Sequence, residues 1–136
     1  MRNVFASVLI VAAAPQLASA HVVRHNSIPE AYLGTWAPGE GECGASHKAA
    51  IVLSAKTYAG PSGSCAVDYV SETPSEKGAL FSARLLCPSL RGQAKKTVVN
   101  LIFRLDGTDQ VSFGPSFAGL KAYRRCAASE PAPKQQ

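Results

Sequence analysis

Tyr32-Leu33-Gly34-Thr35-Trp36 places a Gly-x-Trp sequence at the start of the first in a series of short predicted strands. A Trp at this position suits the closed end of a small antiparallel barrel, where its ring fills the interior and its N–H still reaches a partner. Gly34 lets the entering chain pass close beneath the barrel. On the last predicted strand, Arg124 or Arg125 can lay a guanidinium over the Trp36 face, a cation–π contact worth about 1 kcal/mol. We assign Arg124 to this barrel base and keep Arg125 as the alternative.

The pairing of Gly34-x-Trp36 with a late Arg resembles the lipocalin-like (calycin) barrels. It is also similar to the small periplasmic barrels of the bacterial alkaline-metalloprotease inhibitor family. The resemblance implies an antiparallel barrel with the Trp at its base. It further implies a binding function, either a small apolar ligand held in the barrel or a protease whose cleft receives an N-terminal arm. By position, His21 to Ile28 would be that arm.

The first twenty residues have the features of a secretory signal. Met1-Arg2-Asn3 carries a positive charge, Val4 to Ala14 is almost wholly apolar, and Ala18-Ser19-Ala20 is a small-residue cleavage site. The apolar run is too short for an ordinary transmembrane helix. We therefore expect a periplasmic or secreted protein whose mature chain has 116 residues (136 minus 20) and begins at His21.

The remaining length fits one domain. Residues 21–29 show no periodicity and are predicted to be a flexible N-terminal arm. Residues 30–126 form the predicted β-barrel domain, and residues 127–136, with two Pro and a polar end, are predicted to be a disordered tail. We expect a monomer.

All four cysteines lie in the predicted mature chain, and an even count in an oxidising compartment predicts two disulfides. A zinc site is the rival interpretation, but no pair has the Cys-x-x-Cys spacing that such sites favour. If the loop between the two predicted strands that carry Cys65 and Cys87 is a hairpin centred near Glu76, both cysteines lie 11 residues from its centre. We therefore expect Cys65–Cys87 with Cys43–Cys126, and the alternative is Cys43–Cys65 with Cys87–Cys126.

Apolar residues that alternate with polar ones, with a period of two, mark the inner faces of the predicted strands. No convincing helix is present, so the fold class is all-β: a small antiparallel up-and-down β-barrel of seven or eight strands, with a sandwich as the alternative. The residues expected to line or fill the interior are Val67, Tyr69, Phe81, Leu85, Leu101 and Phe103.

Candidate catalytic groups are few. The sequence has no Gly-x-Ser-x-Gly element, and its three His and three Asp are scattered over predicted arm, loops, strand and turns. We therefore expect no enzymatic activity and no cofactor. One metal hypothesis remains, because a mature N-terminus at His21 can chelate copper through its amine and imidazole, as in lytic polysaccharide monooxygenases. His25 or His47 would then have to complete the site.

The predicted mature chain has 13 basic and 9 acidic residues, because Arg2 leaves with the signal. Arg91, Lys95 and Lys96 share one loop and form a candidate anion patch. Nucleic acid is not an expected partner, because the aromatic residues are not interleaved with these charges. We expect a non-enzymatic binding or interaction protein, and inhibition of a protein partner is one form that this function can take. The alternative is a carrier of a small apolar or amphipathic ligand.

Overall fold

The structure is a computed structural model, and it describes residues 14–15, 21–38, 43, 49–89 and 95–127. The expected signal peptide, apart from residues 14–15, and the expected tail after Ala127 lie outside the described residues. The described residues form two short 3-10 helices, η1 (Glu30–Tyr32) and η2 (Phe117–Gly119), and nine strands. The strands are β1 (Val23–His25), β2 (Gly34–Ala37), β3 (Ile51–Leu53), β4 (Thr57–Gly60), β5 (Gly63–Thr73), β6 (Leu80–Cys87), β7 (Thr97–Leu105), β8 (Gln110–Gly114) and β9 (Lys121–Arg125).

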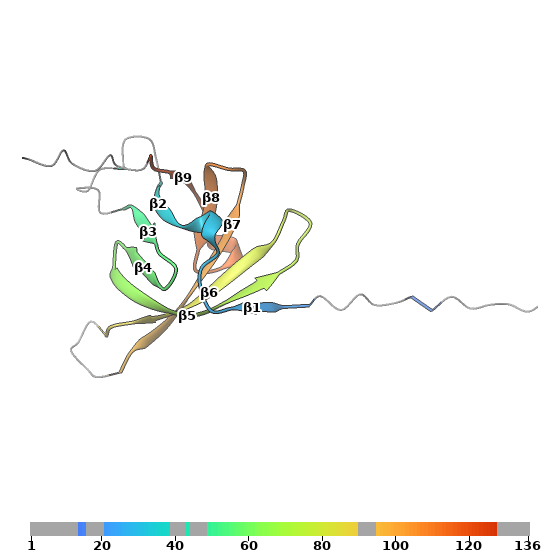
Figure 1. Cartoon of the computed structure of the whole chain (residues 1–136), viewed down its shortest axis with the longest axis horizontal. Coiled ribbons are helices and arrows are strands. Elements are labelled where there is room, and N and C mark those ends of the chain that lie inside the picture. The colour runs from blue at the N-terminus through green and yellow to red at the C-terminus, as the bar shows by residue number, and fades with distance from the viewer. Residues whose placement is uncertain (1–13, 16–20, 39–42, 44–48, 90–94, 128–136) are drawn as a thin grey trace, which may run out of the picture.

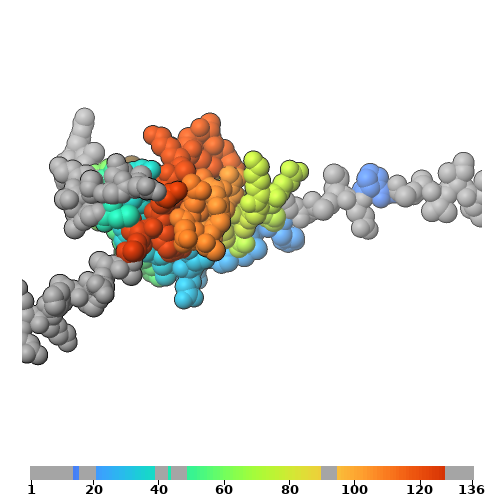
Figure 2. Space-filling model, turned by 90° about the horizontal axis from the view of Figure 1, so that it is seen from above, coloured from blue at the N-terminus to red at the C-terminus, as the bar shows by residue number. Residues whose placement is uncertain are grey.

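Strands β2 to β9 form a closed antiparallel barrel of eight strands (Figure 1). Each strand pairs with its neighbour in the sequence, and β9 pairs with β2 to complete the ring. This confirms the predicted all-β up-and-down barrel. We call the end that contains η1, the β5–β6 hairpin and the β7–β8 turn the base, and the opposite end the mouth. In Figure 2 the β5–β6 hairpin (yellow-green) lies beside the β7–β8 segment (orange).

Strand β1 lies outside the ring and extends the sheet along β5. Val23 pairs with Glu72 and His25 pairs with Val70, while the imidazole Nε2 of His25 lies 2.6 Å from a carboxylate oxygen of Glu72. Ile28, which follows, is 2% exposed and packs in the core. The prediction of a flexible arm was therefore wrong for this segment. The reason is that three residues pairing with the edge of a long strand leave no periodic pattern in the sequence.

The barrel interior is filled from the base upwards by apolar side chains. Trp36 and Phe103 are completely buried, and Phe103 stacks on Phe81 with ring centroids 5.6 Å apart. Of the residues predicted to line or fill the interior, five are buried in this core: Val67, Phe81, Leu85, Leu101 and Phe103.

Tyr69 is the exception, because a β-bulge shifts the alternation of β5. Val67 pairs with Leu85, but the next pairing is Tyr69 with Arg84, so Asp68 is the extra residue. Beyond the bulge, Val70 takes the inner position and is completely buried. Tyr69 faces outward, with the guanidinium carbon of Arg24 at 4.0 Å from its ring centroid. The interior assignment of Tyr69 was therefore wrong, since one inserted residue reverses the face of every residue that follows.

Both disulfides have the predicted pairing. Cys65–Cys87 joins the adjacent strands β5 and β6, with Cα atoms 4.3 Å apart. Cys43–Cys126 ties the segment after β2 to the end of β9, with Cα atoms 5.5 Å apart. The second bond therefore lies at the seam where the ring closes.

Candidate functional site

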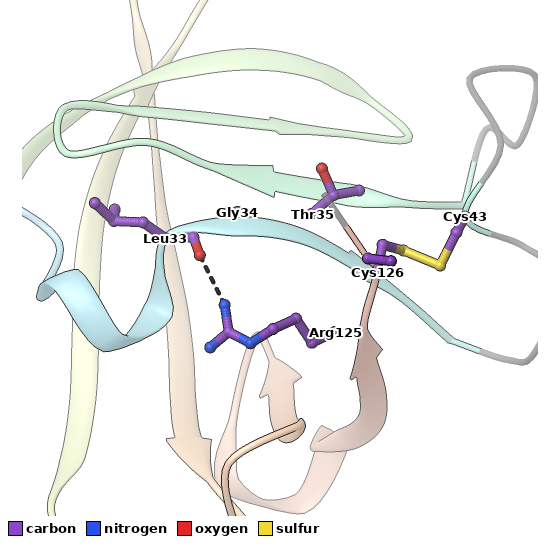
Figure 3. Close-up of a pocket in the computed structure, with 7 residues that line it drawn as sticks. Leu33, Gly34, Thr35, Cys43, Arg125 and Cys126 are labelled. Atoms are coloured by element: carbon purple, nitrogen blue, oxygen red, sulfur yellow. Dashed lines mark hydrogen bonds between the residues drawn. A yellow bond between two sulfur atoms is a disulfide. The ribbon is translucent and has the colours of Figure 1, made fainter. Parts of the chain in front are cut away.

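The base of the barrel is a packed structural element built on Trp36. Its indole N–H donates a hydrogen bond of 2.9 Å to the carbonyl oxygen of Tyr32. The guanidinium carbon of Arg125 lies 4.2 Å from the Trp36 ring centroid. Arg125 also donates to the carbonyl oxygens of Leu33 (3.0 Å, Figure 3) and Ala31 (2.7 Å). One side chain thus satisfies two backbone carbonyls at the point where the chain enters the barrel.

This geometry corrects the assignment of Arg124 to the base. In the β2–β9 register Trp36 pairs with Arg125, and paired residues of antiparallel strands project to the same face. Arg124 pairs with Ala37 and is exposed. Gly34 keeps its predicted place: its φ is +122°, and a Cβ there would lie 3.6 Å from the Arg125 guanidinium.

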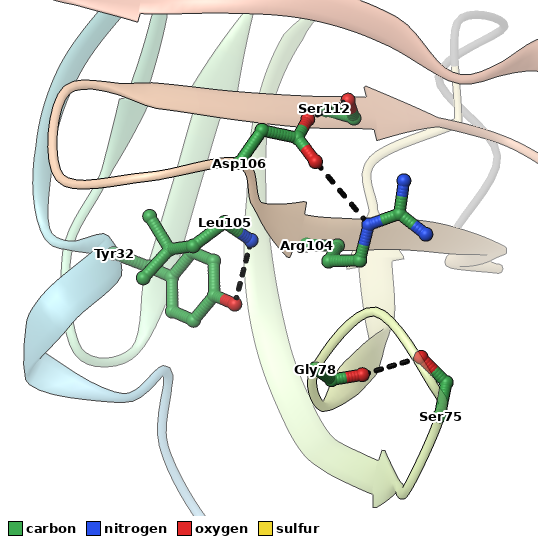
Figure 4. A network of polar contacts seen from close by, with 7 residues as sticks. All are labelled: Tyr32, Ser75, Gly78, Arg104, Leu105, Asp106 and Ser112. Carbon is green, nitrogen blue, oxygen red and sulfur yellow. Dashed lines mark hydrogen bonds and ion pairs between the residues drawn. The ribbon is translucent and has the colours of Figure 1, made fainter.

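Tyr32 closes the base from the other side (Figure 4). Its hydroxyl accepts a hydrogen bond of 3.1 Å from the backbone N–H of Leu105, and its ring packs edge-on against Phe81 and Phe103. Burial raises the pKa of the Tyr32 phenol above its ordinary value of 10.0, although the hydrogen bond from Leu105 acts in the opposite direction. At the base, therefore, the polar groups and rings around Trp36 and Tyr32 contact one another.

The mouth differs, because inward-facing side chains there remain accessible. Val99 pairs with the buried Leu85 and so belongs to the inner face, yet it is 41% exposed. It borders a hollow of about 320 Å³, which we call the mouth hollow. Leu101 and Phe113 form part of its floor, and Lys121 lies on its wall.

Two tyrosines form another wall of the mouth hollow. Tyr58 pairs with Leu53 and Cys65, and it lies over Gly60, where any Cβ would overlap the phenol. Burial, followed by the nearby phenol of Tyr123, raises the pKa of Tyr58 above 10.0. The phenol therefore stays neutral around pH 7, and the wall offers aromatic surface and hydroxyl groups rather than a charge.

A second hollow, of about 460 Å³, adjoins the first and contains the Cys65–Cys87 disulfide in its wall. Ser62 and Val99 line both hollows. We call this second space the disulfide hollow. Together the two hollows make an accessible, mostly apolar inner surface at one end of the barrel.

The charges of the described residues are unevenly distributed along the barrel. Lys95 and Lys96 directly precede β7 at the mouth, and Lys121 lies at the mouth hollow. Arg91, the third member of the predicted anion patch, lies outside the described residues. Among the described carboxylates, Asp68 lies on the outer face of β5, 3.7 Å from the Nε of Arg84. The others belong to η1, the end of β5, the β5–β6 hairpin and the β7–β8 turn, at the base: Glu30, Glu72, Glu76, Asp106 and Asp109.

The described residues contain no group of three or more His, Cys, Asp or Glu side chains arranged to hold a metal ion. His21 is exposed, His25 contacts Glu72, and His47 lies outside the described residues. The structure therefore does not bring a second histidine to His21 within the part of the chain that it describes. Nor does any helix in that part have the length and hydropathy of a membrane span.

The mouth hollow was not predicted, although its residues are inner-face residues of predicted strands. It exists because β7 has nine residues and β8 has five, so the wall of the barrel is incomplete beside the start of β7. The Gly114-Pro115 sequence, which ends β8, was the available indication. The regular pairing of β8 ends directly before this Pro, while the longer strand β7 continues.

Comparisons of this chain with protein-family models, with curated proteins and with solved structures found no match. The fold itself is compatible with the calycin-like class, since it is a closed eight-stranded antiparallel barrel with one additional strand.

Proposed function

We propose that this protein is an exported, non-enzymatic binding protein whose site is the mouth hollow. The observation that carries the proposal is the exposure of Val99, an inner-face residue, beside Tyr58, Leu101 and Phe113. Concave, mostly apolar surfaces with a few polar groups are the usual form of a binding site. The lipocalin-like resemblance of Gly34-x-Trp36 and the late Arg supports the same class of function.

A matched pair of substitutions tests the site. Val99 and Val52 are equally exposed valines (41% and 40%), but Val52 pairs with Thr35 and Ala59 on the outer wall. We expect the wild-type protein to bind 8-anilinonaphthalene-1-sulfonate, an apolar anion, saturably. Val99→Asp should abolish this binding and Val52→Asp should leave it unchanged, measured by dye fluorescence and by amide chemical shifts at the mouth. Equal binding by both variants would place the site elsewhere.

An inhibitor that acts through residues His21 to Ile28 has less support. Val23–His25 pair with β5 and Ile28 is buried, so only the first residues of this segment extend from the barrel. We therefore favour binding at the mouth over insertion of an N-terminal arm into a protease cleft. Removal of His21 and Val22 should leave dye binding at the mouth hollow unchanged. In an arm mechanism, the same removal would abolish inhibition of the protease.

Export is proposed on the sequence of residues 1–20. Expression of the full chain in a bacterial host and native mass spectrometry of the periplasmic fraction test it directly. We expect the mass of residues 21–136 less four hydrogens, which corresponds to two disulfides. A retained ligand would add mass that is lost on unfolding. A full-length product in the cytoplasm would contradict the proposal.

A further inference from the structure

Strand β7 continues past the end of its neighbour β8 (Figure 1). On one edge it pairs with β6 from Thr97 to Phe103. On the other edge it pairs with β8 only from Ile102 to Leu105. Among the described residues, no strand pairs with Thr97–Leu101 on this second edge. We call this segment the free edge of β7.

The backbone groups that face the free edge follow from the ladder at the other end of the strand. There, the N–H of Asp106 donates to the carbonyl oxygen of Gln110, 2.9 Å away, across the β7–β8 side. Successive residues of a strand direct their N–H and C=O groups to opposite edges, so even-numbered residues face β8. Continued along β7, this alternation puts the N–H and C=O of Val98 and Asn100 on the free edge. The backbone N–H and C=O groups of Val99 and Leu101 point to β6.

The chain after β8 leaves this edge uncovered by turning away at once. A Cβ on Gly114 would overlap the carbonyl oxygen of Gly119, so the loop folds back tightly over the end of β8. Val98 and Val99, on opposite faces of β7 beside this edge, are 46% and 41% exposed. A segment of strand with unpaired backbone groups and exposed valines is a template for pairing with another chain.

The mouth hollow lies directly beside the free edge. Val99, Asn100 and Leu101 of β7 line one side of it, and Lys121 and Tyr123 of β9 line another. A strand added to β7 would direct alternate side chains to the inner face, where the hollow can take an apolar one. The nearby charges are those of Lys95, Lys96 and Lys121, while five of the six described carboxylates are at the base and the sixth, Asp68, is paired with Arg84.

We propose that the free edge of β7 binds an extended peptide segment in which acidic and apolar residues alternate. The backbone of the segment pairs with Val98 and Asn100, one apolar side chain enters the mouth hollow, and the carboxylates lie near the lysines. This mode of recognition gives affinity through main-chain hydrogen bonds and specificity through the pocket beside them. The inference rests on the proposed function and names the class of partner for that site.

Amide hydrogen exchange followed by NMR tests the free edge residue by residue. In the protein alone, we expect the amides of Val98 and Asn100 to exchange fast and those of Val99 and Leu101 to exchange slowly. The probe is a synthetic peptide of about eight residues that alternates glutamate with valine or phenylalanine. At saturation, the amides of Val98 and Asn100 should become protected. Protection of these amides before peptide is added, or no protection after it, would overturn the proposal.

Two matched controls separate backbone pairing from hydrophobic contact. The same peptide with N-methyl groups on alternate residues keeps its side chains but cannot pair, and it should bind at least about tenfold more weakly. In the protein, Val98→Pro removes an N–H that faces the free edge and not β6, whereas Val98→Ala keeps it. We expect Val98→Pro to lose peptide binding while both variants retain dye binding at the mouth hollow. Equal peptide binding by the two variants would contradict the pairing.

The two proposals fail in distinguishable ways. If the wild-type protein binds the dye and Val99→Asp does not, the mouth hollow is a binding site whatever the peptide does. If the dye binds there but the peptide leaves the amides of Val98 and Asn100 unprotected, the inference about the free edge is wrong and the proposed function stands. If neither binds, both proposals are wrong.

Discussion

Arg125 has two roles at the base, since it lies over Trp36 and also donates to the carbonyl oxygens of Ala31 and Leu33. The planar guanidinium can do both at once because its donors lie in a fixed fork around a flat cation. A lysine could supply the charge but not this set of contacts. The residue therefore fixes how the chain enters β2 against the end of β9.

Removal of this contact should cost stability. We expect Arg125→Ala to lower the free energy of unfolding by about 2 to 3 kcal/mol, because it leaves two carbonyls without their donor and removes a cation–π contact. Arg125→Lys should recover only part of this loss. Urea denaturation followed by Trp36 fluorescence measures the effect. Arg124→Ala is the matched control on the same strand, and a larger loss from that variant would contradict the arrangement.

The buried phenols make stability depend on alkaline pH. The pKa values of Tyr32 and Tyr58 are raised above 10.0 by burial in the folded protein. The folded state therefore holds these protons more tightly than the unfolded state does. The corresponding stabilisation is complete below the unfolded pKa and is lost as the pH rises through the folded pKa.

We therefore expect the free energy of unfolding to fall as the pH rises above about 10, the range in which the exposed Tyr side chains of the unfolded chain titrate. Tyr58→Phe keeps the ring and removes one of the two groups, so its stability should fall less steeply over the same range. Urea denaturation at a series of pH values measures both slopes. The same slope in the variant and the wild type would show that Tyr58 does not contribute.

At the scale of the strand, the bulge at Asp68 explains why one predicted interior residue was wrong and its neighbours were right. Val67 and Leu85 follow the period of two from the Cys65–Cys87 end, and the period predicted both. Beyond Asp68 the same pattern assigns Tyr69 to the interior in place of Val70. The sequence Val67-Asp68-Tyr69-Val70 fits either register, so only the pairing with β6 decides between them.

The choice between Arg124 and Arg125 was open for a related reason. The interior positions and the Cys65–Cys87 pair follow from patterns within one strand or one hairpin. The residue over Trp36 depends on the register between β2 and β9, which are far apart in the sequence. The mouth hollow depends on the different lengths of β7 and β8. Properties of a pair of strands cannot be read from the pattern of either strand alone.

The loop after β8 depends on Gly114 for its tight return. We expect Gly114→Ala to destabilise the protein by about 1 to 3 kcal/mol, because the new Cβ meets backbone that must shift. Gly119→Ala is the matched control in the same loop, since its Cβ would meet its nearest atom at an ordinary 3.4 Å. Thermal unfolding of the two variants measures the difference. Equal stability would show that the loop can move away from Gly114 without cost.

At the scale of the whole molecule, the two disulfides should contribute unequally. Cys65–Cys87 spans 22 residues and Cys43–Cys126 spans 83, and the chain-entropy relation gives about 3.4 and about 4.5 kcal/mol for them. Replacement of Cys43 and Cys126 by alanine should therefore lower the stability by about 1 kcal/mol more than replacement of Cys65 and Cys87. Urea denaturation of the two double variants measures the order. The reverse order would mean that the seam between β2 and β9 is held by its other contacts.

The order of the strands in the ring also sets the order in which the chain can fold. Seven of the eight pairings in the ring join consecutive strands and can form as local hairpins, while the pairing of β2 with β9 brings together residues far apart in the sequence. Contacts of large sequence separation carry the largest loop-closure cost and tend to form late. Trp36, the single tryptophan of the chain, lies in that last pairing. Because Trp36 also pairs with Ile51 in the β2–β3 hairpin, its fluorescence in a stopped-flow experiment would report the formation of that hairpin and then the closing of the ring.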